Sequence, residues 1–223
     1  MLGVVVLASV ASAAGDGEAV MHAAPTCDKG RAHCFEIQLH VVDLTAPPSG
    51  GAAADRGFVA TPEWIAAQVA GANRHFAALD VGFQLAGVDT LPASFDHVES
   101  RGQRDALAAQ KLGGKVIHVF VVGQLDDVDE EGAIAYGVTW HRRNDDRKYV
   151  IVSAAALERT LAHELGHFFG LPHSTYAISI MNKSDRSDPP IEQRTFADEE
   201  IAAMRPKLAQ LLHDKVIADV APR

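Results

Sequence analysis

Alternating apolar and polar positions predict short strands separated by helices. Residues 34–42 alternate before turning fully apolar, which is typical of a strand, and residues 81–85 and 149–152 repeat the pattern more briefly. Residues 115–122 form a nearly continuous β-branched run, which predicts a central strand buried on both faces. His118 lies inside this run, so we expect a core histidine with a backbone partner rather than a metal ligand.

Apolar residues at helical spacing mark three further segments. Thr61-Pro62-Glu63 has the composition of a helix start, and the spacing continues to about Leu79. Residues 99–111 predict a second, weaker helix. Thr195 to Asp198 resemble a capping box, which predicts a C-terminal helix. Pro206 interrupts that helix, so we expect a kink or two short helices.

The remaining segments define the domain organisation. Residues 46–57 are rich in proline, glycine and alanine and predict a loop. Residues 1–13 form a short apolar run that ends in Ala-Ser-Ala, which indicates a secretory signal peptide whose start is truncated, since it lacks a basic region. Residues 14–33 show no periodicity and predict a tail or short pro-segment. We therefore predict one domain with a single hydrophobic core over residues 34–223.

Charge and cysteine content narrow the function classes. The formal net charge is −9, which leaves no basic field for phosphates and argues against a nucleic-acid partner. No apolar run is long enough to span a membrane, and we expect a monomer. Cys27 and Cys34 are the two cysteines, and in a secreted chain we expect them to form a disulfide.

The strongest chemical pattern is His163-Glu164-Leu165-Gly166-His167. Residues four apart on a helix share a face, so His163 and His167 can present two imidazoles to one metal ion. Glu164 flanks that ion, where it can hold and deprotonate a metal-bound water.

A third histidine completes the pattern only if the helix stops. Gly170 favours the left-handed conformation that ends helices, and Pro172 prevents the hydrogen bonding from resuming. His173 is then free to reach the same ion. Three protein nitrogens plus one water are the open coordination of a catalytic Zn²⁺.

The eleven residues 163–173, H-E-x-x-H-x-x-G-x-x-H, resemble the zinc-binding consensus of the metzincin metallopeptidases. Met181 stands where that clan carries its methionine turn, and His173-Ser174 is similar to the matrixins. Asn182-Lys183 departs from the Tyr-Pro that follows the methionine in matrixins, so the family within the clan stays open. The resemblance implies an α+β fold: a twisted, mostly parallel sheet with an antiparallel edge strand, an active-site helix, a Met-turn and a C-terminal helix.

The resemblance also implies roles for residues outside the motif. Residues 132–140 would form the edge strand above the cleft, where Ala133, Ile134, Ala135 and Tyr136 would pair with an extended substrate. Met181 would form an apolar floor under the imidazoles. Tyr136 and Tyr176 are candidates to place a hydroxyl near the oxyanion that forms when water attacks a peptide carbonyl. As an alternative to the disulfide, Cys27 could place its thiolate on the zinc and keep the enzyme latent, as matrixin propeptides do.

The predicted function is a secreted zinc-dependent endopeptidase with a protein or peptide substrate. Glu164 would take a proton from zinc-bound water and pass it to the leaving amine. The alternatives are a zinc-binding module without turnover, a hydrolase of a non-protein amide, and an exopeptidase. The acidic run at residues 126–131 predicts a solvated loop, with a Ca²⁺ site as the alternative.

Overall fold

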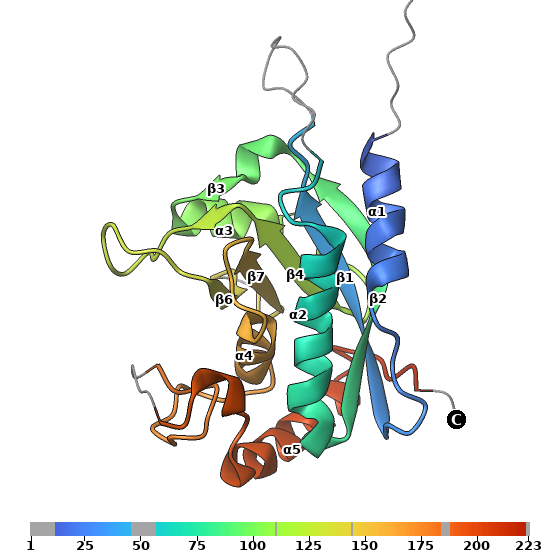
Figure 1. Ribbon diagram of the computed structural model, residues 1–223, viewed down its shortest axis with the longest axis vertical. Coiled ribbons are helices and arrows are strands. Elements are labelled where there is room, and N and C mark those ends of the chain that lie inside the picture. Colours follow the sequence, from blue (N-terminus) through green and yellow to red (C-terminus); the bar gives the residue numbers. More distant parts are fainter. Residues whose placement is uncertain (1–11, 46–56, 110, 144, 184–187, 222–223) are drawn as a thin grey trace, which may run out of the picture.

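The fold is built on one five-stranded sheet. The computed structural model describes residues 12–45, 57–109, 111–143, 145–183 and 188–221. The strands are β1 (His33–Val42), β2 (Val81–Leu91), β4 (Ile117–Val122), β6 (Gly137–His141) and β7 (Lys148–Ser153), in the spatial order β2-β1-β4-β7-β6 (Figure 1). All neighbours run parallel except β6, which pairs antiparallel with β7 at the sheet edge. The predicted α+β fold, with its mostly parallel sheet and antiparallel edge strand, is confirmed.

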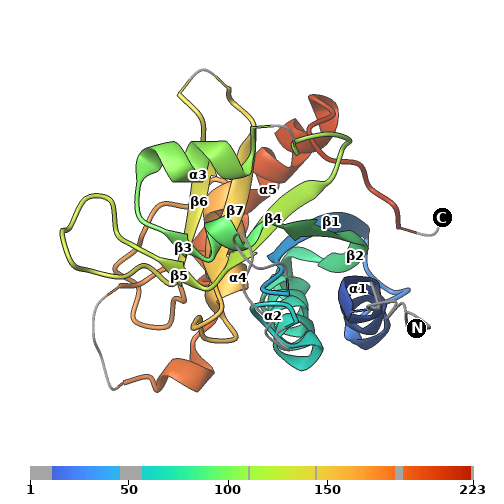
Figure 2. The same ribbon diagram turned by 90° about the horizontal axis from the view of Figure 1, so that it is seen from above.

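Helices cover both faces of this sheet. α1 (Ser12–Ala23), α2 (Pro62–His75) and α4 (Thr160–Phe168) lie on one face, and α3 (Arg101–Leu107) lies on the other (Figure 2). α5 (Asp198–His213) packs at the lower end of α2 and α4 in Figure 1. The smaller elements are the 3-10 turns η1 (Phe76–Leu79), η2 (Ala93–Phe95) and η3 (Ile191–Gln193), and a parallel pair of β3 (His97–Val98) and β5 (Gln124–Leu125). None of the described helices is long and apolar enough to cross a bilayer.

The alternation of side chains along each strand determines which of them pack against the helices on one face of the sheet and which against the other face. Ile37 and Leu39 of β1 pack toward α2 and α4, whereas Val42 joins the opposite layer with α3. All six residues of β4 are buried, as a strand covered on both faces requires. The predicted helix start is confirmed too, because Thr61 Oγ1 accepts a hydrogen bond from the Trp64 amide at 3.2 Å.

His118 is a core histidine, as predicted. Its Nε2 lies 2.8 Å from the Gly113 carbonyl oxygen, and its Nδ1 lies 3.0 Å from His40 Nε2. A carbonyl only accepts, so His118 Nε2 carries the proton and its Nδ1 accepts from His40. Burial lowers the pKa of both rings, that of His40 to about 4, so both are neutral at neutral pH.

The N-terminal segment, predicted as a tail or short pro-segment over residues 14–33, contains a helix that the sequence pattern did not predict. Residues 12–23 form α1, which packs on α2 and β2, with Val20 fully buried. This helix is rich in alanine and glycine and has almost no apolar stripe, so the sequence shows no helical periodicity there. Packing on the rest of the domain stabilises it. Cys27 and Cys34 form the predicted disulfide, which leaves Cys27 no thiolate to place on a metal. The predicted signal peptide and the loop at 46–57 lie almost wholly outside the described residues.

The C-terminal helix is not divided into two short helices at Pro206, which was one of the two outcomes predicted there. Pro206 lies inside a single continuous α5 rather than between two short helices. Met204 and Leu208 are buried on either side of the proline, so the core holds both halves in line. Pro206 itself faces solvent, where water can satisfy the carbonyl that lost its helical donor.

Candidate metal centre and its cleft

Three histidines converge at the C-terminal half of α4. His163 and His167 lie one turn apart on the helix, and His173 follows it in the chain. One ring nitrogen from each lies within 4.8 Å of the other two, and Nε2 of His167 is 3.2 Å from Nε2 of His173. Such a group of three nitrogens matches the ligand set of a catalytic zinc site.

Backbone carbonyls orient two of these rings. Nδ1 of His163 lies 2.7 Å from the Ile180 oxygen, and Nδ1 of His167 lies 2.7 Å from the Leu171 oxygen. Each Nδ1 must therefore carry the proton, which leaves the Nε2 lone pair free for a metal. Burial lowers the pKa of His163 and of His173 to about 4. Neutral imidazoles with fixed tautomers fit a zinc ion, because a metal binds the deprotonated nitrogen.

The end of α4 frees His173, as predicted. The helix ends at Phe168, and Gly170 takes a φ of +96°, a left-handed conformation that side chains disfavour. The Leu171 amide then donates to the Gly166 carbonyl at 2.9 Å and reverses the chain. The helix α4 begins at Thr160, while Ser153 closes β7, with its hydroxyl donating to the Gly123 carbonyl.

A buried turn around Met181 lies beneath α4. Met181 is fully buried, and its sulfur lies against Gly166, beside His167. The Met181 amide donates to the Ser179 hydroxyl, which donates to the buried Glu200 carboxylate of α5 at 2.7–2.8 Å. Glu200 also accepts from the Ala197 amide, so the helix cap is formed there and not by the predicted Thr195. α5 thus fixes the position of the turn.

Glu164 is buried next to the histidine cluster. Its side chain is 4% exposed, and its Oε2 lies 3.1 Å from the Thr139 hydroxyl of β6. The same hydroxyl donates to the Glu164 backbone carbonyl at 2.5 Å. Burial raises the pKa of Glu164 to about 7, while the Thr139 hydrogen bonds oppose the shift. A carboxylate in this position suits proton transfer near neutral pH.

We expect Thr139→Val to lower kcat for peptide hydrolysis about tenfold, because it removes the hydroxyl that orients Glu164. Thr139→Ser keeps that hydroxyl and should restore most of the rate. Steady-state kinetics on the three proteins, each with its zinc content measured, checks this. Equal loss in the serine and valine variants would contradict an orienting role.

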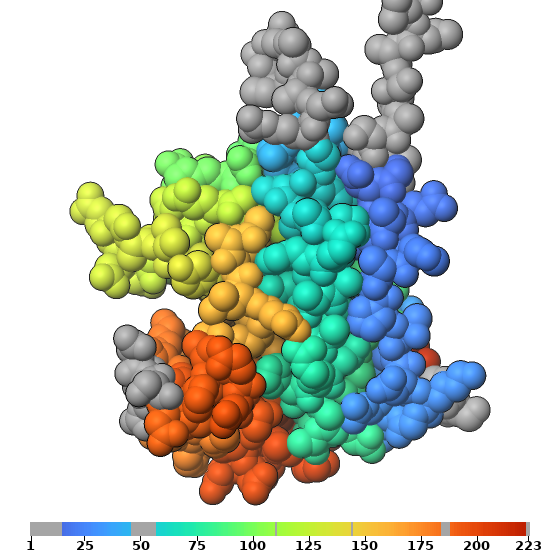
Figure 3. All heavy atoms as spheres, in the orientation of Figure 1, coloured from blue at the N-terminus to red at the C-terminus, as the bar shows by residue number. Residues whose placement is uncertain are grey.

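Two cavities meet at the histidines and form one cleft. One measures about 420 Å³ and contains His163 and Glu164 in its wall; the other measures about 580 Å³ and contains all three histidines. Figure 3 shows the molecule hollowed here, between the protruding segment near residues 125–135 and the segments of residues 175–183 and 188–195. β6 comes close to α4 because residue 137 is glycine: a Cβ there would lie 2.8 Å from Glu164 Cγ.

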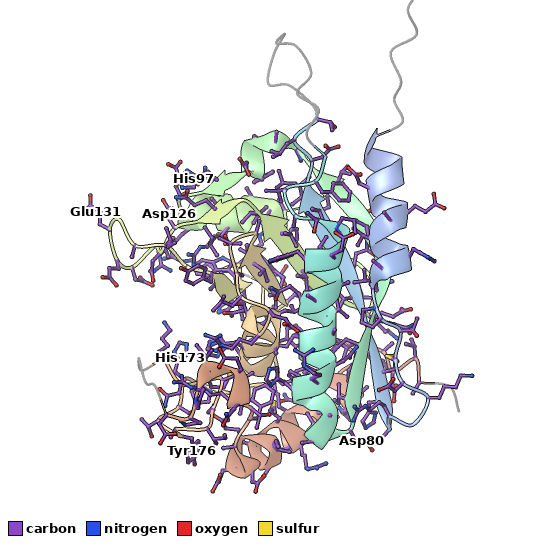
Figure 4. All side chains as sticks on the ribbon, viewed as in Figure 1. Asp80, His97, Asp126, Glu131, His173 and Tyr176 are labelled. Atoms are coloured by element: carbon purple, nitrogen blue, oxygen red, sulfur yellow. A yellow bond between two sulfur atoms is a disulfide. The ribbon has the colours of Figure 1, made fainter. Side chains whose placement is uncertain are left out.

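The predicted rim residues are placed unequally. Ile134, Ala135 and Tyr136 line the 420 Å³ cavity, but Ala133 lines neither cavity and accepts a hydrogen bond from the Asp127 amide. Tyr176 lines neither cavity and lies below His173 in Figure 4. Residues 133–136 precede the strand itself, which begins at Gly137 rather than at Gly132.

The acidic run lies on the upper wall of the cleft, where Asp127 lines both cavities and Asp129 lines the larger one. Asp126 is 2.8 Å from His97, and both are labelled on that wall in Figure 4, whereas His173 lies on the lower one. His97, Glu99 and Asp126 also bring ligand atoms within 4.8 Å of one another, but the described geometry is that of an exposed histidine–carboxylate pair. The Ca²⁺ alternative stays a prediction.

Three further cleft residues escaped sequence reasoning. Thr139 contacts Glu164 from another strand. Lys183 lines both cavities, where its charge adds to burial in lowering the pKa of the three histidines and opposes the burial that raises the pKa of Glu164. Arg159 lines the smaller cavity one turn before His163. Of these three residues, only Arg159 could have been found from the sequence, because it lies four residues before His163 and therefore shares a helix face with it.

Comparisons with known proteins agree with this geometry. The family model described as Matrixin matches residues 45–203, which include the histidine motif and the Met181 turn. No curated protein matches the chain.

Solved structures resemble the fold at low sequence identity. Archaemetzincin from Methanopyrus kandleri is 15% identical with a TM-score of 0.51, over 80% of this chain and 98% of that one. Metalloproteinase-II from Bacteroides fragilis is 15% identical with a TM-score of 0.49, over 82% of this chain and 55% of that one. A zinc-dependent peptidase from Methanocorpusculum labreanum is 14% identical with a TM-score of 0.39, over 76% and 100%. With its family model covering most of the chain, the protein belongs to the matrixins, within the metzincin-like zinc metallopeptidases.

Proposed function

We propose that this protein is a secreted, zinc-dependent endopeptidase that cleaves internal peptide bonds of proteins. The observation that carries the proposal is the buried Glu164 carboxylate next to three converging imidazole nitrogens, in a cleft that extends to both sides of them. A chain passing through such a cleft has room on either side of the bond to be cut, which an exopeptidase does not need.

The residues divide the work as follows. His163, His167 and His173 would hold one zinc ion, which when bound acts as a Lewis acid on the scissile carbonyl and lowers the pKa of a water ligand. Glu164 accepts a proton from the attacking water and delivers it to the leaving amine. Thr139 orients the carboxylate, and Met181 packs beneath the imidazoles as an apolar floor.

The sheet edge supports binding of an extended peptide. β6 ends the sheet, so its outer backbone groups have no partner strand among the described residues. The Ala135 amide and the Ala133 oxygen pair inward with the Leu125–Asp127 segment, which leaves the backbone groups of Ile134 directed to the other side. An extended substrate can add to this edge as a further strand, with main-chain hydrogen bonds that do not depend on sequence.

Secretion is supported by the cysteines. Cys27 and Cys34 form a disulfide, which is rare in the reducing cytosol and common in exported proteins. The apolar residues 1–13 supply a matching signal peptide.

The test uses the full chain and peptides blocked at both ends. We expect one zinc per chain, cleavage of internal bonds, loss of activity when a chelator removes the metal, and recovery when zinc is returned. Mass spectrometry of the products and metal analysis check this. Release of single terminal residues from unblocked peptides alone would indicate an exopeptidase, and one zinc without any cleavage would indicate a binding module.

A further inference from the structure

The described residues that line the 420 Å³ cavity beside His163 include three cations. Arg159, Lys183 and Arg194 contribute to its wall, against the single carboxylate of Asp127 once Glu164 is assigned to proton transfer. The Asp127 carboxylate already accepts a hydrogen bond from the Asp129 amide, and its charge acts on Arg104 at the other side of the cleft. Asp127 is therefore engaged elsewhere and is not an ion-pair partner of Arg159.

Arg159 differs in its surroundings from the arginines that form ion pairs with carboxylates, such as Arg74 with Glu158 and Arg147 with Asp145. No carboxylate of the described residues lies within ion-pair distance of Arg159, although it is half-buried. Burial and the nearby charge of Arg194 both lower its pKa, with only a partial offset from Glu192. A half-buried guanidinium without a counter-ion favours an incoming anion.

Arg159 is also positioned by the same backbone as the reacting groups. It lies one helical turn before His163, and its carbonyl accepts the His163 amide hydrogen bond at 3.0 Å. Its side chain and the Glu164 carboxyl line one cavity. A peptide whose scissile carbonyl lies at Glu164 would therefore place the side chain of an adjacent residue in reach of Arg159.

The walls of the cavity suit a side chain with an apolar stem. Ile134 and Tyr136 form the upper wall and Ile191 the lower one, and all three are more than one-third exposed. Methylene groups can pack against these walls while a terminal carboxylate reaches the guanidinium, which binds carboxylates in a bidentate fork.

Resting on the proposed peptidase function, we propose that Arg159 makes this cavity a recognition site for an acidic side chain, so that the enzyme prefers to cleave beside glutamate or aspartate. The ligand is the substrate's own carboxylate, from a residue flanking the scissile bond. Arg159 is a specificity residue and takes no part in the chemical step.

A pair of peptides tests this directly. Both are blocked at the two ends, and they differ only by glutamate or glutamine at the flanking position, which cleavage of a blocked random library first identifies. We expect wild type to favour the glutamate peptide roughly tenfold in kcat/KM, the gain of one charge-assisted contact. Arg159→Gln should bring that ratio close to one, Arg159→Lys should keep part of it, and Arg159→Glu should favour a lysine peptide instead.

The control variant is Arg205→Gln, an exposed arginine on α5, which should keep the wild-type ratio. Zinc content and melting temperature verify that each variant is folded. A ratio near one in wild type, or a ratio unchanged in Arg159→Gln, would overturn the proposal. A library that yields only apolar residues at both flanking positions would overturn it as well.

A binding measurement separates this proposal from the proposed function. Zinc-loaded Glu164→Ala should bind the fluorescently labelled glutamate peptide more tightly than the glutamine peptide, and adding Arg159→Gln should abolish the difference. If neither wild type nor any variant cleaves a peptide, the endopeptidase proposal fails. Fluorescence anisotropy, which measures this peptide binding, still decides the role of Arg159. Equal binding of the two peptides to Glu164→Ala would reject it.

Discussion

Replacing Glu164 by glutamine is expected to reduce kcat/KM for an internally cleaved peptide by about 1,000-fold or more, with zinc binding unchanged. Glutamine keeps the size of the side chain but cannot accept the water proton, and general-base catalysis contributes about 10²- to 10⁴-fold. The His163 and His167 rings are oriented by the carbonyls of Ile180 and Leu171 and not by Glu164, so these metal ligands stay in place. Steady-state kinetics beside metal analysis measures both effects.

The matched control for this variant is Glu158→Gln. Glu158 is an exposed glutamate just before α4 whose partner is Arg74, outside the cleft, so its loss should leave turnover near wild type. If Glu164→Gln retained full activity, another group would have to take the proton. If it lost zinc together with activity, Glu164 would have a role in forming the metal site that its contact with Thr139 does not suggest.

The sequence correctly predicts those features of the fold that are determined by residues close together in the chain. The spacing of His163 and His167 follows from the helical repeat, and Gly170 ends the helix because its backbone takes a positive φ. The burial of β4 follows from its continuous β-branched run. Each of these needs only neighbouring residues, so the pattern and the structure agree.

The errors have their cause in contacts between distant segments. α1 has no apolar stripe of its own, and packing on α2 and β2 stabilises it. Pro206 reduces local helix stability, but the buried Met204 and Leu208 keep α5 continuous. Thr195 was predicted to cap the C-terminal helix, whereas in the structure the Glu200 carboxylate accepts from the Ala197 amide and caps α5. Local propensity is a weak prior wherever tertiary contacts decide.

The cleft shows the same division. The motif predicts where zinc and its base would lie, but the residues that shape the cleft come from other elements. Thr139 reaches Glu164 from β6, and Lys183 comes from the segment after the Met181 turn. Gly137 matters only because β6 passes close to α4. Specificity is therefore encoded in the way the segments pack, and the zinc motif alone does not determine it.

His173→Ala is expected to weaken zinc binding by at least about 100-fold, more than the usual effect of losing a group that merely orients a ligand. The two remaining histidines lie on one helix face and would hold the ion with half of a tetrahedral set. Because His173 lies in the exposed segment after Gly170, the substitution removes a ligand without creating a cavity in the core. Competition with a chromophoric chelator measures the affinity, and a thermal melt of the metal-free protein should show no change.

His213→Ala supplies the matched control, since His213 is an exposed histidine at the end of α5 that pairs only with Asp214. It should bind zinc as wild type does. Unchanged affinity in His173→Ala would mean that the third ligand comes from elsewhere in the chain. In that case a shared metal ion would not explain why His173 Nε2 lies 3.2 Å from His167 Nε2. The endopeptidase proposal, which depends on an open three-histidine site, would then need a different third ligand.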